Sequence, residues 1–359
     1  MRKIAASFFI LILLVLLTGC GAASSPTTPV PPVTSRLALV ANSISDSISG
    51  YAIDAQSGRL SLKGTVPTGG TSPRVIAVEP SGRFAYVANT ASNDISVFAI
   101  DTNTGTLRRL GAPVPAGNRP QFIVVGPTGS LLYVVNQNSN NLSGFSIDPN
   151  TGALTPLSGT VVTDNLPVGL SFHPSGRFAY VANSNSSDVT VYAVSNTGAL
   201  GLLGAVPART NPTSITMHPS GKFAYLANSG SNDITVLSVD PVSGVLAVLP
   251  GRADTGNSPT SVTVDSQGRF AYVTHSIAGN IAVFAINGAT GALTPGSVVS
   301  TGVNPVSLTL DASGQFAYVA NQGSDDISVF AVDRVTGALT PAGPAVVAGT
   351  GPAWVTIVE

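Results

Sequence analysis

The chain has 359 residues, of which 43% are hydrophobic, so it is long enough to bury a sizeable core. Only 9% are charged, against roughly 25% in an average soluble domain, and the 16 Lys and Arg nearly balance the 17 Asp and Glu. This composition excludes the concentrated positive charge that a nucleic-acid partner requires, and a single cysteine excludes an intrachain disulfide.

Residues 1–19 are expected to be an export signal. Arg2 and Lys3 precede an apolar run over residues 4–17, which is too short for the ~20 residues of a spanning helix. The run ends in "LTGC", which resembles the lipobox of bacterial lipoproteins. The resemblance implies cleavage before Cys20, lipidation of Cys20 and membrane lipid as a partner. Residues 20–34 are rich in Pro, Ser and Thr and are predicted to be a tether. We therefore expect an exported, membrane-anchored lipoprotein on the periplasmic side of an outer membrane or at the cell surface.

Residues 35–359 repeat one unit seven times. The equivalent positions are Leu39, Tyr86, Tyr133, Tyr180, Tyr225, Tyr272 and Tyr318, at spacings of 47, 47, 47, 45, 47 and 46 residues. A period in the forties with four strand-like pieces is typical of a β-propeller blade.

One period divides into four predicted strands, here over residues 73–79, 83–89, 95–101 and 106–117. Gly82 is expected to supply the positive φ of the turn between the first two strands. Prolines recur in the fourth strand, which places it at the outer edge of the blade, because proline cannot donate to a ladder.

The chain begins this domain with a second strand and ends it with a first strand, near Pro352. The last strand is therefore expected to complete the blade that the first residues begin. The prediction is an all-β, seven-bladed propeller with four-stranded antiparallel blades, in which the C-terminal strand closes the ring.

The segments "FAYVAN", "DISVFAID" and "TGALTPL" resemble the YVTN repeat and the lactonase family related to 6-phosphogluconolactonase. The resemblance implies a site containing a "PRH" element, a "PH" element and an acidic residue after the Asn of "VNE". Arg74 matches the arginine of the first element, whereas Val75 replaces its histidine and Gln121 is the nearest match to the second. No Glu follows the repeated Asn in any blade, so the sequence offers no obvious general base.

Residues that break the repeat on one face of the propeller are the candidates for a site. Arg74 and His275 are the weak catalytic candidates. The ligand-binding candidates are Arg74, Arg119, Gln121, His275 and Trp354, with the two arginines placed to hold a carboxylate or phosphate. Arg209, Arg252, Asp164 and Asp254 are weaker candidates on the same loops. His173 and His218 are interpreted as surface turn residues, and the repeated Asn, Asp and Ser before the third strand as turn formers. No metal site and no cofactor are expected.

The first hypothesis for function is a non-enzymatic binding or scaffolding module at the cell envelope, with a protein or glycan partner on one face. The alternative is a lactone hydrolase, a carboxylic ester hydrolase acting on a sugar lactone or a related lactone at the channel mouth. A structural surface protein or adhesin is the third.

Overall fold

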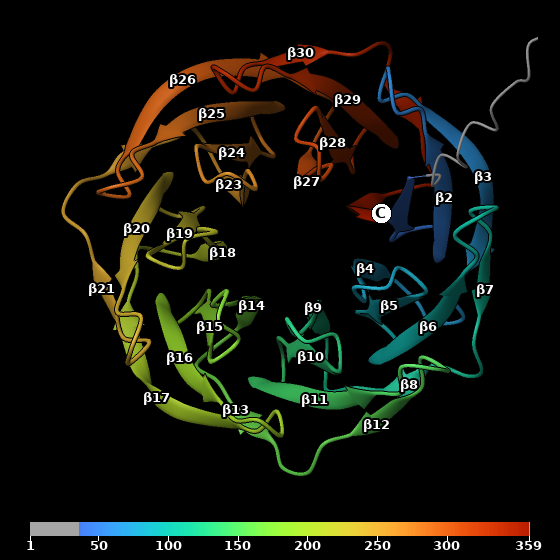
Figure 1. Ribbon diagram of the computed structural model, residues 1–359, viewed down its shortest axis with the longest axis horizontal. Coiled ribbons are helices and arrows are strands. Elements are labelled where there is room, and N and C mark those ends of the chain that lie inside the picture. The colour runs from blue at the N-terminus through green and yellow to red at the C-terminus, as the bar shows by residue number, and fades with distance from the viewer. Residues whose placement is uncertain (1–35, 359) are drawn as a thin grey trace, which may run out of the picture. The chain divides into compact units, whose positions relative to one another are not determined.

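The computed structural model describes residues 36–358. These residues form seven antiparallel sheets arranged as a closed ring, which confirms the predicted seven-bladed propeller (Figure 1). The signal peptide, Cys20 and the tether lie outside the described residues. Within residues 36–358, no helix has the length and apolar character needed to cross a membrane.

The first strand of every blade lies innermost and begins at a proline (Figure 1). These strands are β4 (Pro73–Val78), β9 (Pro120–Val125), β14 (Pro167–Phe172), β18 (Pro212–Met217), β23 (Pro259–Val264), β27 (Pro305–Leu310) and β32 (Pro352–Val358).

The second strands carry the repeated "FAYVAN" segment and are almost wholly buried. They are β1 (Leu37–Asn42), β5 (Phe84–Asn89), β10 (Leu131–Asn136), β15 (Phe178–Asn183), β19 (Phe223–Asn228), β24 (Phe270–His275) and β28 (Phe316–Asn321). The third strands alternate apolar and polar residues. They are β2 (Ser47–Ile53), β6 (Asp94–Ile100), β11 (Asn141–Ile147), β16 (Asp188–Val194), β20 (Asp233–Val239), β25 (Asn280–Ile286) and β29 (Asp326–Val332).

The fourth strands form the outer rim and are largely exposed, as their prolines predict. Blades are numbered in chain order from the one that contains β1. In blades 1, 4 and 6 the fourth strands are continuous: β3 (Leu60–Pro67), β17 (Leu200–Pro207) and β26 (Leu293–Ser300). In the other blades two short strands pair with the third strand in succession. These pairs are β7 (Leu107–Arg109) with β8 (Val114–Pro115), β12 (Leu154–Pro156) with β13 (Val161–Val162), β21 (Leu246–Val248) with β22 (Ala253–Asp254), and β30 (Leu339–Pro341) with β31 (Val346–Val347).

Strand β32 closes the ring by pairing antiparallel with β1, as predicted. Leu39 lies opposite Thr356, and Ala41 opposite Trp354. An ion pair reinforces the closure, because Arg36 Nη1 lies 2.9 Å from Oδ2 of Asp311 in blade 7. The two ends of the propeller are thus held by both backbone and side-chain contacts.

The core lies between the blades. The described residues form seven apolar clusters, and each combines side chains of two neighbouring blades. A blade therefore buries its apolar faces only with both neighbours in place, so the ring rather than the single blade is the stable unit.

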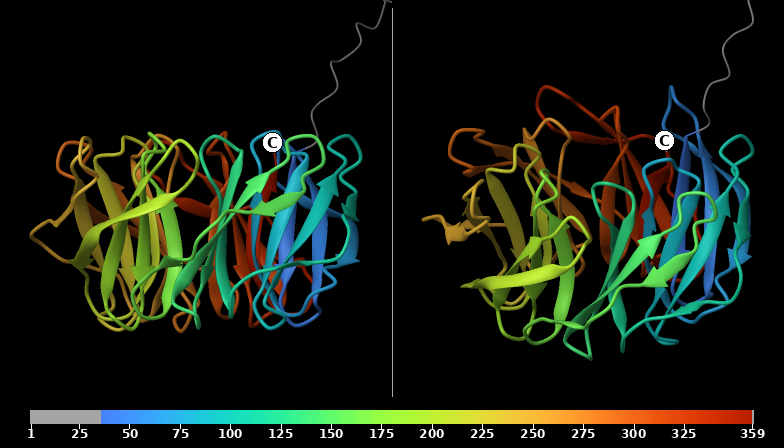
Figure 2. Two further views of the ribbon diagram at one scale, coloured as in Figure 1. Left: turned by 90° about the horizontal axis from the view of Figure 1, so that it is seen from below. Right: turned by 60° about the horizontal axis from the view of Figure 1, so that its bottom comes forward.

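The ring has two faces, seen edge-on in Figure 2. The face at which the first strands begin is called the mouth face here. The face at which the first and second strands are joined is called the hairpin face. Each of those hairpins contains a glycine in the left-handed region, such as Gly82 with φ 71°, as expected.

Candidate active site at the channel mouth

The first strands surround a central cavity of about 280 Å³. It brings together three of the predicted residues, Arg74 from β4, Gln121 from β9 and Trp354 from β32. Arg74 and Gln121 immediately follow the proline that begins their strand, and Trp354 lies two residues after it. All three therefore lie toward the mouth face.

Arg74 is the central charge of this cavity. With the amide of Gln121 oriented so that its carbonyl faces the guanidinium, that oxygen accepts hydrogen bonds from Arg74 Nε at 2.8 Å and Nη2 at 3.0 Å. Among residues 36–358, no carboxylate lies within ion-pair distance of Arg74. Burial lowers the pKa of Arg74, and the positive charge of Arg119 lowers it further. The Arg74 guanidinium, desolvated and held by the neutral amide of Gln121, can bind an anion or a polarised carbonyl.

Arg119 lies on the loop before β9 and is exposed. Its backbone is in the left-handed region, with φ 57°, and its amide donates to Oδ1 of Asn93 at 2.7 Å. Arg119 is not among the residues that line the cavity, yet it is close enough to act electrostatically on Arg74. The two arginines are thus neighbours at the mouth, as the sequence suggested, with Arg74 alone on the cavity wall.

Trp354 packs against Phe122 in an edge-to-face arrangement, with ring centroids 5.7 Å apart. It is partly buried, and it contributes both to this packing and to the cavity wall. The remaining wall is mostly neutral. Its threonines bond carbonyls of the neighbouring blade, as when Thr213 Oγ1 donates to Pro259 O at 3.0 Å and Thr260 Oγ1 to Pro305 O at 3.1 Å.

The weaker candidate arginines are already neutralised. Nε of Arg209 and of Arg252 lies 3.5 and 3.4 Å from Oδ2 of the buried Asp233, and Arg252 also pairs with Asp254. Asp164 is exposed and likewise does not line the cavity. No Asp, Glu or His occurs among the described residues of the cavity wall, and residues 36–358 hold no group of three or more potential metal ligands.

His275 was expected on the ligand-side face; it lies at the mouth-face end of β24, opposite Pro259 of β23, but its side chain is buried rather than presented to a ligand. Its residue is only 1% exposed at the end of β24, and it does not line the channel cavity. Neither ring nitrogen makes a hydrogen bond of good geometry among the described residues. Burial lowers the pKa of His275, and the nearby side chain and backbone of Asn280 offset part of this shift. The imidazole fills a position that is internal in every blade, so a break in the repeat there does not reach the surface.

The position of His275 belongs to a side-chain network that the sequence did not reveal. In the other six blades an Asn donates from Nδ2 to the first residue of the third strand and to a hydroxyl two residues later. The twelve distances lie between 2.6 and 3.2 Å. The interpretation of these residues as structural is therefore supported, although their partners are side chains rather than nearby backbone. In blade 6 Ala282 replaces the hydroxyl residue, whereas Asn280 keeps the other partner position, so the loss of the hydroxyl partner could have been read from the sequence.

His173 and His218 are also not the surface residues that were expected. They are 7% and 5% exposed. Their Nε2 atoms lie 3.2 Å from Gly221 O and 2.8 Å from Gly268 O, each in the next blade. Both rings therefore fill seams between blades at the hairpin face.

The comparisons with known proteins agree with this architecture. The sequence matches the family described as "Lactonase, 7-bladed beta-propeller" over residues 33–119, 113–172, 163–250 and 245–357. The chain belongs to this lactonase family. No curated protein matches the sequence.

Several solved structures share the fold of this lactonase-family propeller at low sequence identity. A putative 6-phosphogluconolactonase from Bacteroides uniformis has a TM-score of 0.82 and 21% identity, covering 90% of this chain and 100% of its own. A second, from Bacteroides fragilis, has a TM-score of 0.82 and 20% identity over 92% and 100%. The periplasmic gluconolactonase PpgL of Pseudomonas aeruginosa has a TM-score of 0.79 and 20% identity over 90% and 99%.

Proposed function

We propose that the protein hydrolyses a lactone, such as a sugar lactone, at the mouth of the central channel. The observation that carries the proposal is Arg74, a partly buried guanidinium on the cavity wall without a carboxylate partner in the described chain. Membership of the lactonase family and the names of the two putative 6-phosphogluconolactonases and of PpgL support the substrate class.

In this reaction Arg74 donates hydrogen bonds to the lactone carbonyl oxygen and stabilises the negative charge that develops there. Water attacks the carbonyl carbon, the ring C–O bond breaks, and the departing ring oxygen takes up a proton to become a hydroxyl. The product acid then releases a proton to solvent. Gln121 holds the guanidinium in orientation, because its carbonyl engages Nε and Nη2 of Arg74. The described cavity wall offers no general base, so electrostatic stabilisation accounts for the acceleration.

The test is the rate of acid release from gluconolactone by the purified protein above the rate in buffer. Arg74→Ala is expected to lose about 10²-fold of the acceleration, the effect of removing one oxyanion donor. Arg83→Ala is the matched control, since Arg83 is an exposed arginine on the hairpin face that donates to Pro149 O. If Arg74→Ala releases acid as fast as the wild type, the proposed role of Arg74 is refuted.

A binding module without turnover is the second candidate, and the neutral cavity wall favours it. The single tryptophan of the chain, Trp354, lies on that wall, so its fluorescence reports occupancy of the channel. A lactone that changes this fluorescence without accelerated acid release supports binding alone. Binding by a protein or glycan on the mouth face is the broader form of this candidate.

The proposed location is the cell envelope, with anchoring through lipid on Cys20. The support is the sequence of residues 1–20. Cys20→Ser is expected to release the protein from the membrane fraction, and an unchanged distribution refutes the anchor.

A further inference from the structure

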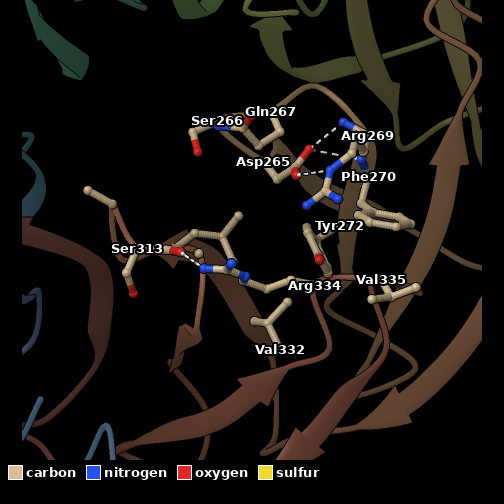
Figure 3. A pocket seen from close by; sticks show the side chains of 13 residues that line it. Asp265, Ser266, Gln267, Arg269, Phe270, Tyr272, Ser313, Val332, Arg334 and Val335 are labelled. Carbon is tan, nitrogen blue, oxygen red and sulfur yellow. Dashed lines mark hydrogen bonds and ion pairs between the residues drawn. The ribbon is translucent and has the colours of Figure 1, made fainter. Parts of the chain in front are cut away.

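A larger cavity, of about 570 Å³, opens at the hairpin face between blades 6 and 7. Asp265, Arg269 and Tyr272 of blade 6 and Ser313 and Arg334 of blade 7 contribute to its wall (Figure 3). It is called the seam cavity here. It lies at the opposite end of the strands from Arg74, so it is not part of the channel-mouth site.

The internal repeat explains why the space exists. In the two preceding seams a histidine fills this place, and a Cβ added to Gly221 or Gly268 would come within 2.5 or 2.3 Å of the ring of His173 or His218. In blade 6 the shorter Asp265 replaces the histidine. A Cβ added to Gly314, the equivalent glycine of blade 7, would meet nothing within 4 Å. Part of the seam cavity is therefore the volume that His173 and His218 fill in the two preceding seams.

Tyr272 provides independent evidence for a missing partner in this seam. In five other blades the equivalent tyrosine hydroxyl donates to a glycine carbonyl of the next blade, at 2.6 to 3.1 Å; these are Tyr86, Tyr133, Tyr180, Tyr225 and Tyr318. The residue Tyr272 is 0% exposed and lines the seam cavity, yet its hydroxyl has no hydrogen-bond partner among the described residues. The hydroxyl has no exposed surface, so a molecule in the seam cavity does not reach it; the missing bond shows that this seam is packed less completely than the other five.

The arginines of the cavity wall also form longer contacts than the equivalent arginines of two other seams. Arg83 and Arg177 donate to carbonyls of the next blade at 2.6 Å, whereas Nε of Arg269 instead lies 3.7 Å from Oδ2 of Asp265 in its own hairpin. Among residues 36–358, Arg334 makes one hydrogen bond, a long one of 3.5 Å from Nη1 to Ser313 O. In Figure 3 the hydroxyl of Tyr272 is seen between the Asp265–Arg269 pair and Arg334. Two arginines against one aspartate leave the wall with a net charge of +1.

We propose that the seam cavity binds a small hydroxylated carboxylate of the size of a sugar acid. Arg334 holds the carboxylate, and Asp265 accepts from a ligand hydroxyl. The volume suits such a ligand, since small-molecule pockets typically enclose ~300–1,000 Å³. The inference does not depend on the proposed lactonase activity, because it uses none of the channel residues.

The experiment titrates the purified protein with glucuronate by calorimetry while following the fluorescence of Trp354. The wild type is expected to bind without a fluorescence change, since Trp354 lies in the channel. The double variant Asp265→His with Gln267→Ser rebuilds the histidine and serine of blades 4 and 5. It is expected to fill the cavity and to abolish binding, whereas Arg74→Ala leaves binding unchanged.

Arg334→Ala keeps the test informative if the double variant fails to fold. It is expected to weaken glucuronate binding about 10- to 100-fold, the effect of one lost hydrogen bond to a charged group. Arg83→Ala is the matched control, because Arg83 lies on the same face, donates to Pro149 O and does not line the seam cavity, and it is expected to leave binding unchanged. Binding that is absent in the wild type, that changes Trp354 fluorescence, or that survives both the double variant and Arg334→Ala overturns the proposal.

Discussion

Replacing His275 with Asn and Ala282 with Ser would give blade 6 the side-chain network of the other six blades. The new amide would donate to the Asn280 side chain and to the introduced hydroxyl, as Asn136 donates to Asn141 and Ser143 at 2.8 and 2.9 Å. Each bond contributes about 1 kcal/mol, and removing the unpartnered imidazole relieves a further 1–3 kcal/mol or so. Some apolar contact of the ring is lost. We expect the free energy of unfolding to rise by about 2 kcal/mol.

Urea denaturation at several pH values measures this effect. Burial lowers the pKa of His275, so below about pH 6.5 the unfolded chain binds a proton that the folded chain does not. The free energy of unfolding of the wild type should therefore decrease as the pH is lowered below about 6.5, by up to about 1.4 kcal/mol per pH unit for this group. The double variant lacks this dependence. Burial lowers the pKa of His173 too, but that residue is common to both proteins and cancels in the difference.

The converse exchange in blade 2, Asn89→His with Ser96→Ala, is the matched control and should destabilise. It removes bonds of 2.7 and 2.8 Å from Asn89 Nδ2 to Asp94 and Ser96. If the blade 6 variant is less stable than the wild type at pH 7, or if its pH dependence is unchanged, His275 is not a buried residue without partners and the reasoning fails.

Two further predictions concern the loops and the ring closure. Arg119→Gly is expected to raise stability by about 1 kcal/mol in a thermal or urea melt, because φ 57° is unfavourable for arginine and the bond from its amide to Asn93 is retained; a loss of stability would contradict this. Asp311→Asn is expected to lower stability by about 1–2 kcal/mol, since it removes the charge that Arg36 engages at 2.9 Å across the closure. An unchanged urea midpoint would show that the strand pairing of β1 with β32 suffices to close the ring.

The channel site illustrates how far a repeat can identify functional residues. Arg74, Gln121 and Trp354 follow prolines that begin equivalent strands, so their convergence on one cavity could be predicted from their places in the repeat. The same reasoning failed for His275, because a position that varies between blades need not face solvent. Its companion Ala282 is the signal that was available, since the two residues occupy one buried network.

The sequence by itself determined the seven blades, the innermost prolines, the outer fourth strands and the closure by β32. These follow from period, alternation and strand count, which are local properties repeated along the chain. Only the tertiary structure decided how neighbouring blades fill the seams. It buried His173, His218 and His275, paired Arg209 and Arg252 with Asp233, and left the Tyr272 hydroxyl without a hydrogen-bond partner in the described part of the chain. The physical reason is that these contacts join side chains from different strands or from neighbouring blades, and such packing depends on side-chain volumes that no single period encodes.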